Sequence, residues 1–92
     1  MTFIQNPPLR KILESIRQYR EKRIDVDGLQ QNVAAIMTAL EGDVPQEVRD
    51  AIYKAESSIE RIRFMVDFDE EASALEKVFN EIEGVNSKYS RQ

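Results

Sequence analysis

The sequence predicts an all-α fold: a small antiparallel bundle of about four helices. Apolar side chains recur at the three- and four-residue spacing of amphipathic helices in four separate segments. Two-residue alternation is not sustained anywhere, and no Asn-Gly or Asp-Gly hairpin lies between apolar runs, so strands are not expected. The 92 residues fit one domain, and short connections between long helices favour antiparallel neighbours.

The first helix is predicted to begin after Asn6, a good N-cap residue, with Pro7 at a position where a missing N–H costs nothing. Its apolar positions follow a helical spacing: Leu9, Ile12, Leu13, Ile16 and Tyr19. The helix is expected to end near Arg23, because basic side chains there complement the negative end of the helix dipole.

The second helix is expected to be capped by Asp25 or Asp27 and to end at Gly42 as the C′ residue. No charged residue occurs from Leu29 to Leu40. Because a helix at the edge of a small bundle usually carries charge on its outer face, this helix is expected to be central or part of an interface.

The third helix is predicted to start at Pro45. A continuous apolar seam runs along one of its faces, formed by Val48, Ile52, Ala55, Ile59, Ile62 and Val66. A break is expected near Asp67–Asp69, because a continued helix would place Asp69 and Ser73 on that seam. This seam is expected to pack inside the bundle.

The fourth helix is expected to be capped by Asp67 or Asp69 and to end at Gly84. Its apolar positions are Leu75, Val78, Phe79 and Ile82. The sequence therefore predicts a single domain with an ordered core over 7–84 and a frayed polar tail over 85–92.

Catalytic and metal-binding side chains are scarce in this sequence. Histidine and cysteine are both absent, which removes His-dependent catalysis, structural zinc sites and disulfides. The expectation is a protein that is not an enzyme and needs no cofactor or metal. One alternative is a magnesium-dependent helical nucleotide pyrophosphohydrolase, because Glu47-x-x-Asp50 and Asp67-x-x-Glu70 have suitable spacing, although an upstream Glu-x-x-Glu is missing.

The net charge of −4 is unevenly distributed. Residues 1–24 carry six Lys or Arg and two Glu, whereas residues 25–60 carry two basic and eight acidic residues. This balance favours a basic protein partner over nucleic acid. A nucleic-acid module remains an alternative, and it would use the basic first helix with Tyr19 among Arg10, Lys11, Arg17, Arg20, Lys22 and Arg23.

The third helix carries a second line of side chains beside its seam. This line contains Arg49, Tyr53, Glu56, Glu60 and Arg63, again with spacings of four and three. An aromatic side chain beside paired carboxylates suits a basic protein surface, so Tyr53, Glu56, Glu60 and Arg63 are predicted partner-binding residues. The alternative is a solvated face on which the arginines neutralise the glutamates.

The end of the third helix adds apolar bulk in Phe64, Met65 and Phe68, interleaved with and followed by Asp67, Asp69, Glu70 and Glu71. The three apolar side chains are expected to pack where the third and fourth helices meet. If they are exposed instead, an apolar patch rimmed by these four acidic residues becomes a second candidate binding site.

The stretch Leu40-Glu41-Gly42-Asp43-Val44-Pro45 and the later Ala55-Glu56-Ser57-Ser58-Ile59-Glu60-Arg61-Ile62-Arg63-Phe64 resemble small helical bacterial immunity proteins of contact-dependent growth inhibition and related polymorphic toxin systems. The resemblance implies an acidic surface that binds a cognate toxin, such as a basic nuclease, at its active site or exosite. The expected function is therefore toxin neutralisation. The alternative is a structural or regulatory bundle that self-associates or docks into a larger assembly.

The sequence favours a cytoplasmic protein that does not associate with membranes. No apolar run approaches the roughly 20 residues needed to cross a bilayer. The segment Met1–Pro8 has neither the basic start nor the apolar stretch of a signal peptide.

Overall fold

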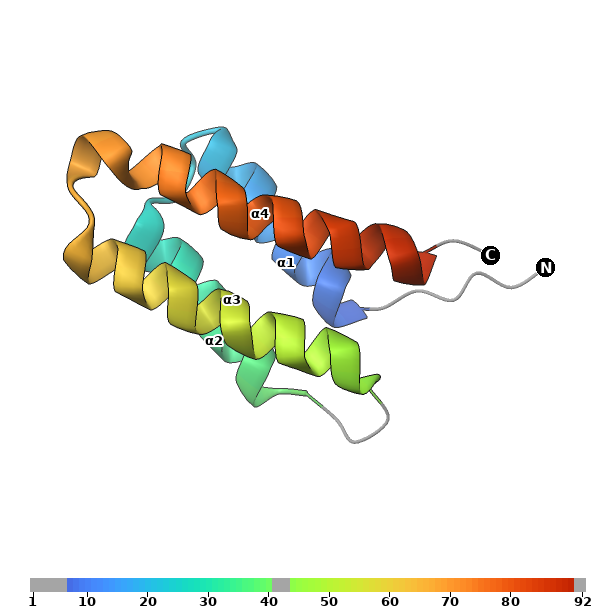
Figure 1. Ribbon diagram of the computed structural model, residues 1–92. Helices are drawn as coiled ribbons and strands as arrows, with labels where there is room; N and C mark the ends of the chain where they lie inside the picture. Colours follow the sequence, from blue (N-terminus) through green and yellow to red (C-terminus); the bar gives the residue numbers. More distant parts are fainter. Residues whose placement is uncertain (1–6, 41–43, 91–92) are drawn as a thin grey trace.

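The computed structural model describes residues 7–40 and 44–90. It contains four helices, α1 (Pro7–Arg20), α2 (Val26–Thr38), α3 (Gln46–Met65) and α4 (Phe68–Ser90), and no strand within the described ranges. Successive helices run in opposite directions (Figure 1). The predicted all-α bundle is therefore confirmed.

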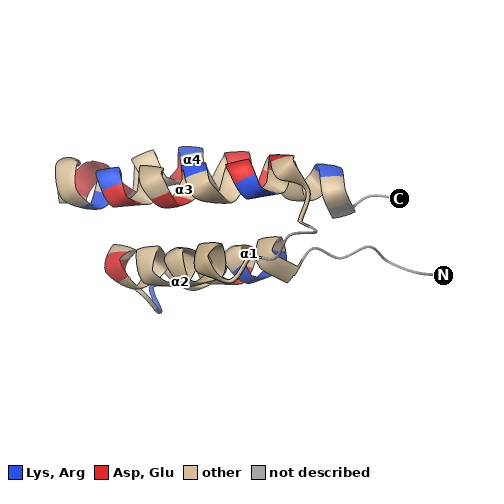
Figure 2. Ribbon diagram, turned by 90° about the horizontal axis from the view of Figure 1, so that it is seen from below, with Lys and Arg blue, Asp and Glu red and all other residues tan. Residues whose placement is uncertain are grey.

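The four helices form two layers, with α1 and α2 in one and α3 and α4 in the other (Figure 2). Helix α2 packs against α1 and α3, α3 packs against α4, and α4 closes the ring on α1. Helix α2 thus has neighbours on two sides, but so does every other helix. Its outward face carries the uncharged, exposed Gln31, Ala35 and Thr38.

The core lies between the two layers and is built from the predicted apolar positions. From α3, the seam residues Val48, Ile52, Ala55, Ile59 and Ile62 are buried, and Val66 packs at the edge. They meet Leu75, Val78, Phe79 and Ile82 of α4, together with Leu9, Ile12 and Ile16 of α1 and Leu29 and Val33 of α2. Helical spacing in the sequence therefore placed the core correctly.

Helix α1 ends at Arg20, before the predicted end at Arg23, in a Schellman turn. The N–H of Arg23 donates to the Gln18 carbonyl at 2.8 Å, and the N–H of Lys22 donates to that of Tyr19 at 3.0 Å. Lys22 has a φ of 64°, a left-handed conformation that glycine adopts more easily than any other residue.

Asp25 is the N-cap of α2, which decides between the two residues predicted for this position. Its side chain accepts a hydrogen bond from the Gly28 N–H at 2.9 Å. The predicted end of α2 at Gly42 is wrong, because the helix ends at Thr38, whose hydroxyl donates to the Ala34 carbonyl. Gly42 and the predicted α1 cap Asn6 lie outside the described residues.

The predicted break between the third and fourth helices is confirmed. Val66 adopts an extended conformation after α3, with φ −106° and ψ 137°, and α4 begins at Phe68. The Asp67 carbonyl accepts a hydrogen bond from the Glu70 N–H at 2.9 Å, which closes the first turn of α4.

The predicted end of the fourth helix at Gly84 is wrong, because α4 continues to Ser90. The apolar face extends past Gly84 through Val85 and Tyr89, which pack against the core. Lys88 Nζ and the Tyr89 hydroxyl both donate to Glu47 Oε1, at 2.8 and 3.0 Å. These contacts hold the last turns of α4 on the first turn of α3. Residues 85–90 of the predicted frayed tail are therefore helical.

None of the helices in the described parts of the chain combines the length and the apolar character needed to cross a membrane.

Candidate functional site

An apolar patch, made of Phe64, Met65 and Phe68, lies on the surface where α3 turns into α4. The exposed fractions of these residues are 68%, 77% and 87%, so the expectation that they pack between the two helices was wrong. Phe64 follows the buried Ile62 by two residues, which places it on the opposite side of α3. Clusters of large exposed apolar side chains mark interaction sites more often than ordinary surface does.

Acidic residues neighbour the apolar patch along the chain. Asp67 and Asp69 flank Phe68 in the sequence, Glu70 follows them, and all three are exposed. On α3, the exposed Glu60 lies one turn before Phe64. We call Glu60, Asp67, Asp69 and Glu70 the acidic rim.

Arg63 joins α3 to α2 instead of neutralising Glu60. Its guanidinium forms an ion pair with Asp27 at 2.9 Å and donates a hydrogen bond to Gln30 Oε1 at 2.6 Å. The same guanidinium lies over the Phe64 ring, 4.7 Å from its centroid. This cation–π contact supports the ring of Phe64 from the side of α2 while leaving most of it exposed.

The line predicted on α3 is divided between two environments. Tyr53 is 49% exposed, and Glu60 also faces solvent. Glu56 is half-buried and accepts a long hydrogen bond of 3.4 Å from Gln30, so its carboxylate is directed toward α2. Gln30, which contacts both Glu56 and Arg63, was not among the predicted site residues.

A different spacing selects the outward stripe of α3. Tyr53, Glu60 and Phe64 are separated by seven and then four residues, which returns a helix to nearly the same face. Phe64 belongs to both this stripe and the apolar patch. The spacing of the stripe could have been recognised from the sequence alone.

Glu71 was predicted to rim the apolar patch, but it does not belong to the acidic rim. Only 9% of this residue is exposed. It precedes the buried Leu75 and Val78 by four and seven residues, so it lies on the inner face of α4. Burial, and then the negative charge of Asp25, raise the pKa of the Glu71 carboxyl.

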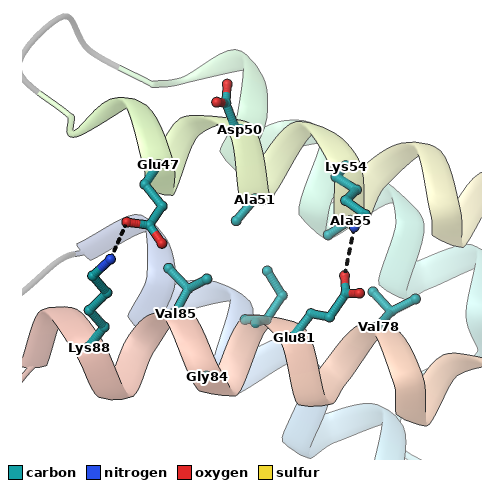
Figure 3. Close-up of a pocket in the computed structure, with 11 residues that line it drawn as sticks. Glu47, Asp50, Ala51, Lys54, Ala55, Val78, Glu81, Gly84, Val85 and Lys88 are labelled. Carbon is teal, nitrogen blue, oxygen red and sulfur yellow. Dashed lines mark hydrogen bonds and ion pairs between the residues drawn. The ribbon is translucent and has the colours of Figure 1, made fainter.

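A shallow groove of about 410 Å³ separates the first half of α3 from the second half of α4 (Figure 3). Small and apolar side chains, Ala51, Ala55 and Val85, face this groove. Ion pairs cross it near both ends, Glu47 with Lys88 at 2.8 Å and Lys54 with Glu81 at 3.5 Å. Its charges are thus largely neutralised within the protein.

The two acidic pairs considered for magnesium lie at opposite ends of α3. Glu47 and Asp50 belong to its start, whereas Asp67 and Glu70 follow its end, and 20 helical residues span about 30 Å. Within 7–40 and 44–90, no three acidic residues gather in a way that could hold a metal ion. The geometry therefore does not assemble the pyrophosphohydrolase site.

Several basic side chains of the first helix are engaged in ion pairs. Arg20 binds Glu76 and Glu83 of α4, both at 2.8 Å, and Arg17 pairs with Glu14 and Glu21. Because these cations already face carboxylates, they are less suited to phosphate groups than the sequence suggested.

Comparisons of the chain with protein-family models, with curated proteins and with solved structures found no match.

Proposed function

We propose that this protein is a protein-binding module whose apolar patch and acidic rim engage a basic protein partner. The observation that carries the proposal is the exposure of Phe64, Met65 and Phe68 among carboxylates, at 68%, 77% and 87%. Complete burial of one such side chain contributes about 1.5–3 kcal/mol, so covering the patch would supply a large share of the free energy of association.

An apolar patch beside an acidic rim matches the usual organisation of protein interfaces. Buried aromatic anchors provide most of the binding energy, and a surrounding ring of polar groups excludes water. Charges at the edge raise the association rate and select the sign of the partner. The patch would supply the anchors here, and the acidic rim would favour a basic surface.

A finer form of this proposal is that the partner is a toxin, such as a basic nuclease, that the protein neutralises. Two features support it: the sequence resemblance to helical immunity proteins, and the carboxylates of the acidic rim. A nuclease surface that binds phosphate is positively charged, so the same carboxylates would compete with its substrate.

Affinity capture from the source cells, followed by mass spectrometry, would identify the partner. The purified partner is then expressed alone and together with this protein. Growth arrest that co-expression relieves would support neutralisation of a toxin. If the partner is not toxic, the proposal of a protein-binding module would stand, but the proposal that the partner is a toxin would be overturned.

The site is tested with Phe64→Ala plus Phe68→Ala, and with Glu60→Lys plus Asp69→Lys. The matched control is Lys77→Ala plus Asn80→Ala, because both residues are exposed on α4 away from the patch. Loss of binding in the first two variants, with the control unchanged, is the expected result. Equal binding in all three would contradict the proposed site.

Self-association is the second candidate, and the uncharged outward face of α2 is the observation that favours it. Gln31, Ala35 and Thr38 are exposed there without a charge among them. Light scattering over a concentration series tests this function. A dimer that Ala35→Arg dissociates would place the interface on α2, whereas a monomer at every concentration would exclude self-association.

A further inference from the structure

A second surface cavity, the end groove, adjoins the apolar patch. It has a volume of about 740 Å³ and lies between the α1–α2 connection and the first turns of α4. Figure 1 shows these segments at the same end of the bundle. Phe68, Asp69 and Glu71 line it from α4, and Tyr19, Ile24 and Asp25 line it from the other side.

Glu71 lines this groove with a carboxylate that is both buried and unpaired. The residue is 91% buried, as its exposed fraction of 9% implies, and no hydrogen bond or ion pair reaches its carboxylate from any residue that the structure describes. In the described parts of the chain, every fully buried side-chain oxygen has a hydrogen-bond partner. Because the Glu71 oxygens have none, they must retain some contact with solvent. The carboxylate thus opens into the groove without a partner from the chain itself.

The balance of charge in the end groove is negative once the internal ion pairs are considered. Arg20 is held by Glu76 and Glu83, and Arg23 lies 3.2 Å from Glu21. Among the described residues that line the groove, Lys22 is the cation that forms no such ion pair. Three carboxylates line the same groove, those of Asp25, Asp69 and Glu71.

Aromatic rings complete the lining. Phe68 is 87% exposed and stands one turn before Glu71 at the start of α4, and both residues line the end groove. Tyr19 lies on the opposite side, where burial and then the charges of Glu71 and Glu76 raise the pKa of its hydroxyl. A planar cation can stack on such rings while it pairs with a carboxylate, and arginine meets both requirements better than lysine.

We infer that the end groove receives an arginine side chain of the protein partner, whose guanidinium pairs with Glu71 and stacks against Phe68. This inference rests on the proposed function, because the arginine belongs to the partner that covers the apolar patch. It adds a specificity pocket to that interface. A buried carboxylate that is left without a cation or a hydrogen-bond donor costs free energy, so the pocket penalises partners that place an apolar side chain there.

The inference can be tested without the partner, using N-acetyl-arginine amide as the probe. Titration is followed by NMR at the amides of 68–72 and at the side-chain carboxyl carbon of Glu71. The expected result is saturable binding with a dissociation constant on the order of 1–10 mM, as suits so small a ligand. The citrulline analogue, which is uncharged and nearly the same shape, should not bind.

Glu71→Gln should remove this binding, and Glu81→Gln, a change at an exposed carboxylate of α4 that does not line the end groove, should retain it. The amide spectrum of each variant establishes that it is folded, and Glu71→Ala provides a second variant. Equal binding of the arginine and citrulline probes would overturn the inference. So would unchanged binding to Glu71→Gln, or displacement of the arginine probe by inorganic phosphate.

Failure of the inference and failure of the proposed function are distinguishable. A partner that binds Glu71→Gln as well as the unaltered protein, but loses binding with Phe64→Ala plus Phe68→Ala, would overturn only the arginine pocket. A partner that binds every one of these variants equally would overturn the proposed interface itself.

Discussion

Arg63 of α3 and Asp27 of α2 form an ion pair at 2.9 Å, next to the exposed ring of Phe64. The pair ties the end of α3 to the start of α2. Since the same guanidinium covers one side of Phe64, a contact within the bundle also sets the position of a proposed binding residue.

Replacing Arg63 with alanine should lower the free energy of unfolding by about 0.5 kcal/mol, because the pair is partly exposed. It should also weaken partner binding, since Phe64 loses the group that supports its ring. Urea unfolding and calorimetric titration measure the two effects. Asp27→Asn is the matched control: it removes the ion pair but keeps Arg63 over Phe64, so it should reduce stability and leave binding nearly intact.

Lys22→Gly should stabilise the protein by about 1 kcal/mol. Lys22 holds a φ of 64° in the turn after α1, and glycine adopts this conformation without the steric cost of a side chain. Lys22→Ala separates conformation from charge, because alanine keeps the cost and loses the ammonium group. If the two variants unfold at the same urea concentration, the left-handed conformation of Lys22 is not a source of strain.

Gly84→Ala should raise the free energy of unfolding by about 0.5–1 kcal/mol, as expected for a glycine inside a helix. A Cβ atom at this position would meet no atom within 4 Å beyond its chain neighbours and the backbone of its own helical turns. Gly28 is the comparison, because a Cβ there would lie 3.3 Å from Cβ of Ile24, so its replacement should gain less. Destabilisation by Gly84→Ala would show that α4 does not continue through this residue as a regular helix.

The stability of the protein should depend on pH through Glu71. Burial raises the pKa of its carboxyl above the value in the unfolded chain, so the folded state holds this proton more tightly. The resulting contribution to stability is present at low pH and is lost as the pH rises through the folded-state pKa. Glu71→Gln should therefore be more stable than the unaltered protein at pH 7.

That advantage should disappear below the pKa of an unfolded glutamate, about 4.3, where both proteins carry a neutral side chain. Urea unfolding across pH 3.5–7.5 measures the difference, with Glu70→Gln as the exposed control. A constant difference between Glu71→Gln and the unaltered protein at every pH would show that ionisation of Glu71 is not responsible.

Most of the fold could be predicted from the sequence, because the core depends on helical spacing. The seam from Val48 to Ile62 and the break before Phe68 follow from that spacing alone. The ends of α2 and α4 were harder. Gly42 and Gly84 are common terminators, but tertiary contacts of Val85, Lys88 and Tyr89 carry α4 past its glycine.

The candidate site was only partly predictable. Spacing identified the acidic and aromatic side chains of α3, but it did not show that Glu56 and Arg63 turn toward Gln30 of α2. Phe64 and Phe68 were expected inside because apolar side chains usually are. Which apolar residue remains exposed depends on where the neighbouring helices end. Local spacing in the sequence does not show where those ends lie in the folded protein.

The proposed interface is tested most directly by calorimetric titration of the purified partner with the Phe64→Ala plus Phe68→Ala variant. Lys77→Ala plus Asn80→Ala is titrated in parallel. We expect at least a 100-fold loss of affinity for the first variant, about 3 kcal/mol, which is typical of central aromatic anchors, and no change for the second. An unchanged affinity for a folded patch variant would show that the partner binds elsewhere.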